Sequence, residues 1–198
     1  MDSQTVTSNS NIEMTRNNVS MGFPNRAQFY SSCQLQNFSM PDSIIFYISK
    51  NPSTSKFYKK MIQSCKCIFI KNPIIIVPSL CFDRRKGWHT QGNRPSKDRQ
   101  NDRSVYLNKL TSKIWISDSL DVWGRTISPI LSSFMPQIYQ CDATTVFIEK
   151  QMFSFNNLMV IASKCVVLYL SIVVIINNDK VVSLEALFKV LPNVKRFT

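Results

Sequence analysis

Residues 183–197 read SLEALFKVLPNVKRF, and this stretch carries the pattern that decides the expected fold. Ser183 is a candidate helix cap, because a serine hydroxyl can accept a hydrogen bond from an otherwise unpaired amide of the first helical turn. Apolar residues then recur at i, i+3, i+4 and i+7, which predicts one buried stripe on a short helix. The stripe consists of Leu184, Leu187, Phe188 and Leu191. Pro192 stops the helix, and residues 194–197 are expected to form a strand.

The same pattern occurs twice more in the C-terminal half of the chain. Thr126 and Ser154 are the corresponding cap candidates, so the three caps recur at an almost constant spacing along the chain. The apolar stripes that follow these caps are Ile127, Ile130, Leu131 and Phe134 in one unit, and Phe155, Leu158, Met159 and Ala162 in the other. Strand-like runs adjoin the helices at residues 114–116, 146–148 and 166–170.

These units predict an α/β fold with about three stacked strand–helix repeats over residues 106–198. A unit of roughly 20–29 residues is typical of leucine-rich repeats, and such units must stack because none covers its own apolar face. Asparagine-ladder positions are not evident, so the array would be irregular, with an extra hairpin around residues 177–179. An ordinary α/β domain is the alternative, and the matching register of three helices favours the repeat.

Residues 40–82 predict a small helical module. The segment 40–69 reads MPDSIIFYISKNPSTSKFYKKMIQSCKCIF. Asp42 or Ser43 could cap a first short helix, since both side chains carry an oxygen that accepts hydrogen bonds. The apolar residues expected to point inward from this helix are Ile44, Ile45 and Ile48.

A second helix and a short strand complete this module. Ser53 or Thr54 could cap an amphipathic helix of about four turns. Its apolar residues are Phe57, Tyr58, Met61, Ile62, Cys65, Ile68 and Phe69. Pro73 and Pro78 then bracket a short buried strand over residues 74–77.

The helical module resembles an F-box. That family opens with Leu-Pro and an acidic residue before a short helix with an inward Ile. Its second helix closes with a small residue or Cys, a basic residue and an aromatic residue. The matching positions are Met40-Pro41-Asp42 for the opening, and Cys65-Lys66 with Phe69 for the close, with Met40 in place of the usual leucine.

The layout of residues 40–198 as a whole resembles the nematode-type F-box proteins, in which divergent leucine-rich-like repeats follow the F-box. The resemblance implies an adaptor that binds the Skp-type linker of a cullin-RING ubiquitin ligase and presents a protein substrate of unknown identity. It implies no covalent chemistry, no cofactor and no metal. The residues expected to contact the linker are Pro41, Ile44, Ile45, Ile48, Phe57, Tyr58 and Met61. Internal packing is the alternative role for each of them, and it is favoured for Ile48 and Met61.

Basic residues concentrate in one polar stretch. The net charge is +12, and residues 83–105 are expected to form an exposed basic loop with few apolar residues. This loop could bind nucleic acid through phosphate contacts and one stacked base, which is the alternative function. The residues concerned are Arg84, Arg85, Lys86, Arg94 and Arg99 for phosphates, and Trp88 for stacking. A solvated insertion is favoured, because a basic run with one aromatic residue is a weak signal.

Other classes of protein find little support in the sequence. A single histidine, His89, falls in the polar stretch, and no nucleophile or phosphate-loop motif is present, so we expect no enzyme. The spacing of Cys65 and Cys67 does not suit a zinc site. The uncharged run 165–176 is too short to span a membrane.

The N-terminal segment and the cysteines indicate where the protein resides. Residues 1–39 are rich in Ser, Asn, Gln and Thr and are expected to be a disordered leader, with some order near residues 29–30. The start MDSQTVTSNS lacks the features of a secretory signal. The six cysteines are therefore expected to be free thiols in a reducing compartment, cytoplasmic or nuclear.

Overall fold

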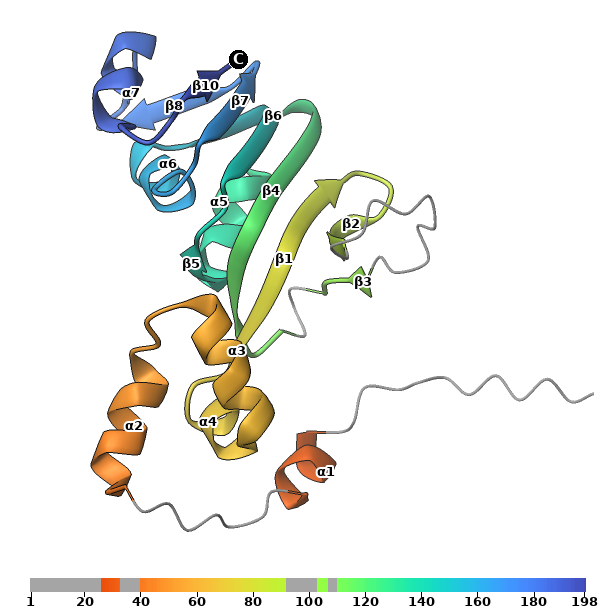
Figure 1. The fold of residues 1–198 in the computed structure, drawn as a ribbon. Coiled ribbons are helices and arrows are strands. Elements are labelled where there is room, and N and C mark those ends of the chain that lie inside the picture. Colours follow the sequence, from red (N-terminus) through yellow and green to blue (C-terminus); the bar gives the residue numbers. More distant parts are fainter. Residues whose placement is uncertain (1–25, 33–39, 92–102, 107–109) are drawn as a thin grey trace, which may run out of the picture. The chain divides into compact units, whose positions relative to one another are not determined.

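The computed structural model describes residues 26–32, 40–91, 103–106 and 110–198, which form a mixed α/β protein (Figure 1). The chain divides into two units, residues 1–36 and 37–198. The described element of the first unit is helix α1 (Arg26–Ser31), which includes the positions 29–30 where order is expected. The rest of the predicted leader, except residue 32, lies outside the described residues.

The second unit begins with three helices, α2 (Asp42–Lys50), α3 (Ser55–Ser64) and α4 (Lys66–Lys71). The Thr54 hydroxyl accepts a hydrogen bond from the backbone N–H three residues later, so the predicted cap of the second helix is confirmed. The single helix of about four turns is wrong, because Cys65 adopts extended backbone angles and separates α3 from α4. The caps predicted at Asp42 and Ser43 are also wrong, since α2 already includes both residues and Pro41 precedes it without a side-chain cap.

A twisted sheet follows the helices, and its central strands run parallel. The strands are β1 (Ile74–Asp83), β2 (Gly87–Gln91), β3 (Arg103–Ser104), β4 (Lys113–Ser128), β5 (Ile138–Cys141), β6 (Thr145–Ser154), β7 (Val167–Ser171), β8 (Val174–Asn177), β9 (Lys180–Val181) and β10 (Arg196–Phe197). The order is β10-β7-β6-β4-β1-β2-β3, in which β10, β7, β6, β4 and β1 are parallel and β2 and β3 extend the sheet antiparallel. Strand β5 pairs with β4, and β8 pairs with β6 and β9. Neighbouring parallel strands thus follow one another along the chain.

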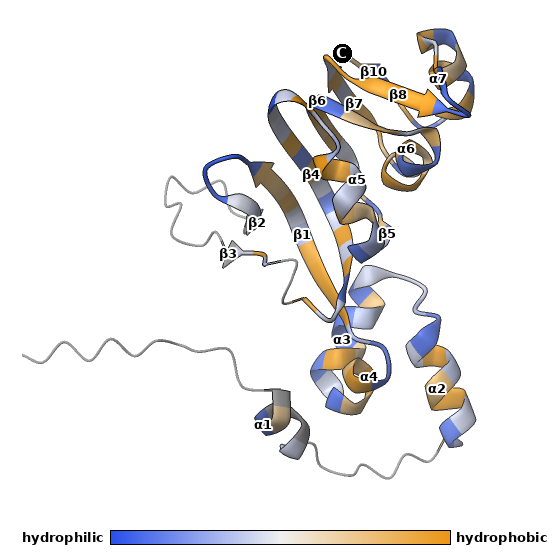
Figure 2. Ribbon diagram, turned by 180° about the vertical axis from the view of Figure 1, so that it is seen from behind, coloured by the Kyte–Doolittle hydropathy of each residue, from blue (hydrophilic) through white to orange (hydrophobic). Residues whose placement is uncertain are grey.

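Short helices connect the parallel strands. They are α5 (Ile130–Phe134) with the 3₁₀ turn η3 (Met135–Gln137), α6 (Phe155–Ile161) and α7 (Leu184–Val190). Figures 1 and 2, seen from opposite sides, show α5 and α6 on one face of the sheet. Equivalent positions in β4, β6, β7 and β10 are Ser119, Thr145, Val167 and Arg196, which align across the sheet although the chain between successive positions varies in length. The strand–helix units are therefore more regular in space than in sequence.

The main core lies between this sheet and its helices. The aligned residues Leu120, Val146 and Leu168 of three adjacent strands are fully buried there, as is Phe134 of α5. The two faces of each strand differ, because side chains alternate along a strand. One face carries this apolar core, and the other face holds mostly half-buried side chains.

Two of the three predicted helix caps in the C-terminal half are confirmed. The hydroxyls of Ser154 and Ser183 accept hydrogen bonds from backbone N–H groups three residues later and cap α6 and α7. The cap predicted at Thr126 is wrong, because β4 continues to Ser128 and α5 begins only at residue 130. Ile127, predicted in the buried stripe, is consequently a strand residue that is half exposed.

The hairpin predicted around residues 177–179 is confirmed. Strands β8 and β9 pair antiparallel, and Asn178 and Asp179 between them have φ angles of 48° and 61°. Two successive left-handed residues form the turn type that suits the twist of a hairpin, and Asn and Asp tolerate these angles better than most residues.

Strand β1 is longer than the strand predicted for this segment. The strand predicted over residues 74–77 continues to Asp83 and pairs with β4 along its length. Pro78 lies at a register irregularity between Val77 and Ser79, where its missing N–H is tolerated. Residues 74–82, assigned to the helical module, are therefore part of the sheet.

The exposed loop predicted over residues 83–105 is also corrected by the structure. Residues 87–91 form β2, which pairs with β1 and β3. Trp88 points into the main core and stacks on Phe134 with a centroid separation of 4.2 Å. Trp88 and the pairing with β1 therefore hold residues 87–91 in the fold, although the polar composition of this segment predicts an exposed loop. Residues 92–102 lie outside the described part of the chain.

Gln151 offers the first test of this packing. Its side chain is fully buried, its Oε1 accepts the backbone N–H of Leu131 at 3.2 Å, and its Nε2 donates to the Lys150 carbonyl at 3.1 Å. We expect Gln151→Leu to lower the free energy of unfolding by about 1–3 kcal/mol, because both backbone groups lose a partner in a buried site. Urea denaturation measures this. Gln63→Leu on the exposed side of α3 is the control, and equal losses in the two variants would contradict the assignment.

Candidate functional site

Helices α2 and α3 carry large apolar side chains that the described residues leave exposed. We name Met40, Ile44, Phe46, Tyr47 and Phe57 the α2–α3 apolar surface. Tyr47 is 67% exposed and Ile44 45%. Figure 2 shows the apolar colouring of α2. A helix that is apolar on nearly all sides is typically covered on all sides, so this surface fits a binding partner.

The residues predicted to contact a linker subunit fall into three groups by exposure. Pro41, Ile44 and Phe57 are exposed, and Ile48 and Met61 are half-buried. Ile45 and Tyr58 are buried, and Tyr58 packs in a core cluster, which corrects their predicted contact role.

Three exposed residues of this surface are not among the predicted linker contacts. They are Met40, Phe46 and Tyr47, all of which the structure leaves open to solvent. The five consecutive apolar residues 44–48 could have indicated the last two, because a helix that packs on one side only does not bury all of its circumference.

A second core cluster fixes α3 and α4 to the sheet. It comprises Tyr58, Cys65, Ile68, Ile74 and Trp115. The Tyr58 hydroxyl donates to the Asn72 carbonyl, and the Asn72 side-chain amide donates to the Ser49 carbonyl at 2.8 Å. Asn72 therefore links α2 and α3 at the start of β1.

Tyr58 gives this cluster a measurable pH dependence. Burial raises the pKa of Tyr58 from 10.0 to about 12. The neutral phenol therefore contributes stability that is complete below pH about 10 and is lost as the pH rises through about 12. We expect the wild-type chain to lose more unfolding free energy across this interval than Tyr58→Phe does. The two chains share their other titrating groups, and parallel losses in urea titrations would contradict the expectation.

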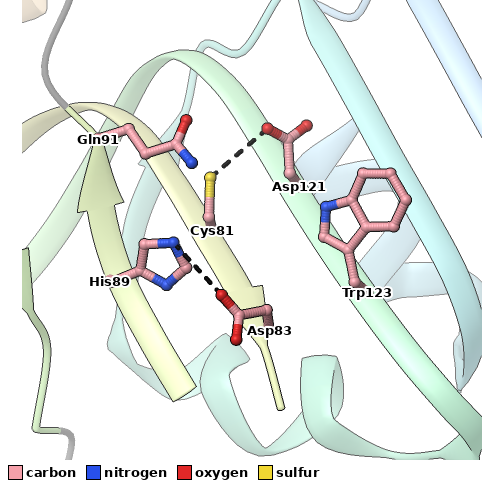
Figure 3. A pocket seen from close by; sticks show the side chains of 6 residues that line it. All are labelled: Cys81, Asp83, His89, Gln91, Asp121 and Trp123. Carbon is pink, nitrogen blue, oxygen red and sulfur yellow. Dashed lines mark hydrogen bonds and ion pairs between the residues drawn. The ribbon is translucent and has the colours of Figure 1, made fainter. Parts of the chain in front are cut away.

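The face of the sheet opposite α5 and α6, here named the open face, carries a cavity of about 310 Å³ (Figure 3). Its lining residues come from three strands: Cys81 and Asp83 from β1, His89 and Gln91 from β2, and Asp121 and Trp123 from β4. Cys81 is aligned with His89 on one side and with Asp121 on the other, so the three side chains share this face. The sequence alone does not reveal this site, because its members meet only through the strand register.

Two carboxylates in this cavity differ in environment. Burial raises the pKa of Asp121, and the thiol of Cys81, which donates to its Oδ2 at 3.5 Å, opposes the shift only in part. Burial also acts on Asp83, but hydrogen bonds from the backbone N–H groups of Lys86 and Arg85, with the nearby charges of His89 and Lys86, lower its pKa overall. Among the described residues, no cation lies within ion-pair distance of Asp121.

His89 is buried in β2, which corrects its expected position in a polar loop away from organised structure. Its Nδ1 lies 3.0 Å from the Gly87 carbonyl, and its Nε2 lies 3.8 Å from Asp83 Oδ2. A nucleophilic cysteine needs surroundings that stabilise the thiolate, whereas Cys81 donates its hydrogen bond to a carboxylate. This geometry favours binding over nucleophilic chemistry. No group of three metal-ligating side chains occurs in the described part of the chain.

The residues of the predicted nucleic-acid contact are only partly brought together. Arg84, Arg85 and Lys86 form an exposed turn between β1 and β2, whereas Arg94 and Arg99 lie outside the described residues. Stacking of a base on Trp88 is wrong, because its indole is buried against Phe134.

Comparison with protein-family models, with curated proteins and with solved structures gives no match. Across the described ranges, every helix falls short of the length and apolar character that a bilayer crossing requires. Cys65, Cys67, Cys81, Cys141 and Cys165 form no disulfide, and Cys33 lies outside the described residues.

Proposed function

We propose that the chain is a substrate adaptor, which binds the Skp-type linker of a cullin-RING ubiquitin ligase through the α2–α3 apolar surface. The observation that carries the proposal is the exposure of large apolar side chains around α2. Such a surface is costly in water and suits a partner with an apolar groove. The F-box resemblance supports this choice of partner. As in that family, a helix pair follows the opening residues, which here are Met40-Pro41-Asp42.

The sheet would supply the substrate-binding half of the adaptor. Its parallel strands align unit by unit, and the length of each unit is close to the roughly 20–29 residues of a leucine-rich repeat. Such arrays leave one strand face available for binding, which agrees with the open face described above. We therefore propose an irregular leucine-rich-like array after a small F-box-like module.

The mechanism would be positioning. An adaptor that holds a substrate beside the ligase raises the effective concentration of substrate lysines near a charged ubiquitin-conjugating enzyme. No residue of this chain would form a covalent bond during the transfer. We propose a cytoplasmic or nuclear setting, where such ligases act.

Co-purification with a Skp-type linker protein at about 0.15 M and about 1 M salt tests the proposal. We expect binding that survives the higher salt, because an apolar interface responds little to ionic strength. A double variant, Pro41→Ala with Ile44→Asp, should weaken binding by about 100-fold or more, because an unpaired charge would be buried in the interface.

A matched control distinguishes the loss of the binding surface from a general loss of folding. Val160 on α6 is exposed to the same 45% as Ile44, so Val160→Asp places a similar charge on a helix outside the surface. This variant should bind the linker as the wild-type chain does. Failure of a wild-type chain that is folded by circular dichroism to bind the linker would refute the adaptor function.

A further inference from the structure

A row of stacked aromatic rings crosses the open face beside the cavity. Trp123 stacks on Phe147 with ring centroids 4.1 Å apart, and Phe147 stacks on Tyr169 at 4.3 Å. The three residues belong to the adjacent strands β4, β6 and β7. Trp123 is 47% exposed and also lines the cavity, so the row begins at the cavity wall.

Carboxylates gather on this part of the open face, although the chain as a whole is basic. The chain carries a net charge of +12, yet the cavity lining holds the carboxylates of Asp83, which lies beside His89, and of Asp121. Glu149, aligned with Trp123 on β6, adds a carboxylate that pairs with Lys150 at 3.0 Å. An anionic ligand would meet repulsion here, whereas a cation would neutralise a carboxylate that is partly withdrawn from water.

We propose that this cavity binds the side chain of an arginine in an extended basic peptide, with the aromatic row beneath the rest of the peptide. A guanidinium is planar, carries five hydrogen-bond donors and stacks on an aromatic face. A lysine ammonium has fewer donors and no planar group that could stack. The cavity is lined by the carboxylates of Asp121 and Asp83, the side-chain amide of Gln91 and the indole of Trp123 (Figure 3). A volume of about 310 Å³ is that of a small ligand site and exceeds the space of a single ion.

If the chain is an adaptor, the arginine-containing peptide is the substrate class that it recognises, and this conclusion rests on the proposed function. Peptide binding itself requires no linker protein. The two proposals can therefore fail separately, since one is measured by linker co-purification and the other by peptide titration.

Titration calorimetry of the full chain with the peptide acetyl-GGRGG-amide tests the inference. The same peptide with citrulline in place of arginine is the matched probe, because citrulline keeps the shape and removes the charge. We expect the arginine peptide to bind at least about 10-fold more tightly than the citrulline peptide. Equal affinities, or no binding to a folded chain, would overturn the proposal.

Two variants locate the site. Asp121→Asn preserves the shape of the side chain and should weaken arginine binding by about 10-fold, and Trp123→Ala should weaken it by about 3-fold to 10-fold. Asp179→Asn makes the same chemical change in the exposed β8–β9 turn and should leave the affinity unchanged. An Asp121→Asn variant that remains folded by near-ultraviolet circular dichroism and binds as tightly as the wild-type chain would also overturn it.

Discussion

Replacing Phe134 by alanine is expected to lower the free energy of unfolding by about 3–5 kcal/mol. The ring lies fully buried at the end of α5 and stacks on Trp88 of β2. Its removal would leave a cavity in the main core and would also take away the surface on which β2 packs. Since whole domains are stable by only about 5–15 kcal/mol, this is a large share of the total.

Urea denaturation followed by circular dichroism measures the loss. Phe57→Ala is the matched control, because this ring on α3 is 46% exposed and its truncation should cost less than about 1 kcal/mol. If Phe134→Ala does not fold, Phe134→Leu keeps most of the volume and should still be less stable than Phe57→Ala. Equal stability of the core and surface variants would contradict the core assignment.

Replacing Trp115 by alanine is expected to cost a similar amount, about 3–5 kcal/mol, and to loosen α3 and α4 from the sheet. Trp115 lies in β4 but packs in the second cluster with Tyr58, Cys65 and Ile68 of the helical segment. Its Nε1 donates to Asp142 Oδ2 at 2.8 Å. The residue therefore couples the helices to a central strand of the sheet.

Amide hydrogen exchange distinguishes loosening from uniform destabilisation. In Trp115→Ala, amides of α3 and α4 should lose more protection than those of β6 and β7. Trp115→Phe should cost less, because it retains an aromatic ring and Asp142 keeps hydrogen bonds from Lys164 and Gln140. Equal protection losses in helices and strands would show that Trp115 does not couple them.

The sequence predicts those parts of the fold that depend on residues close to one another in the chain. A serine hydroxyl three residues before an amide decides a cap, so Ser154 and Ser183 were predictable. Two adjacent turn residues decide a hairpin, as at Asn178 and Asp179. Thr126 fails because periodicity alone cannot show that β4 continues to Ser128.

The candidate sites depend on partners that are distant in the chain. Strand β1 pairs with β4 far along the sequence, and only this register brings Cys81 beside Asp121. The charged residues around Trp88 suggest a loop, but this segment forms β2 because Trp88 packs against the distant α5. Likewise, the inward direction of Ile45 and the outward direction of Tyr47 follow from tertiary packing, because every position from 44 to 48 is apolar.

The coincidence of strand order and chain order has a consequence for synthesis. From β1 through β4, β6 and β7 to β10, each parallel strand adds to the edge left by the parallel strand before it. A nascent chain that emerges from the ribosome can therefore extend its sheet unit by unit, without waiting for a distant C-terminal partner. The helices α2–α4, which precede the sheet in the chain, would already be available when Trp115 emerges and closes the second cluster. Each edge is then a temporary binding surface, and the next segment to leave the ribosome covers it.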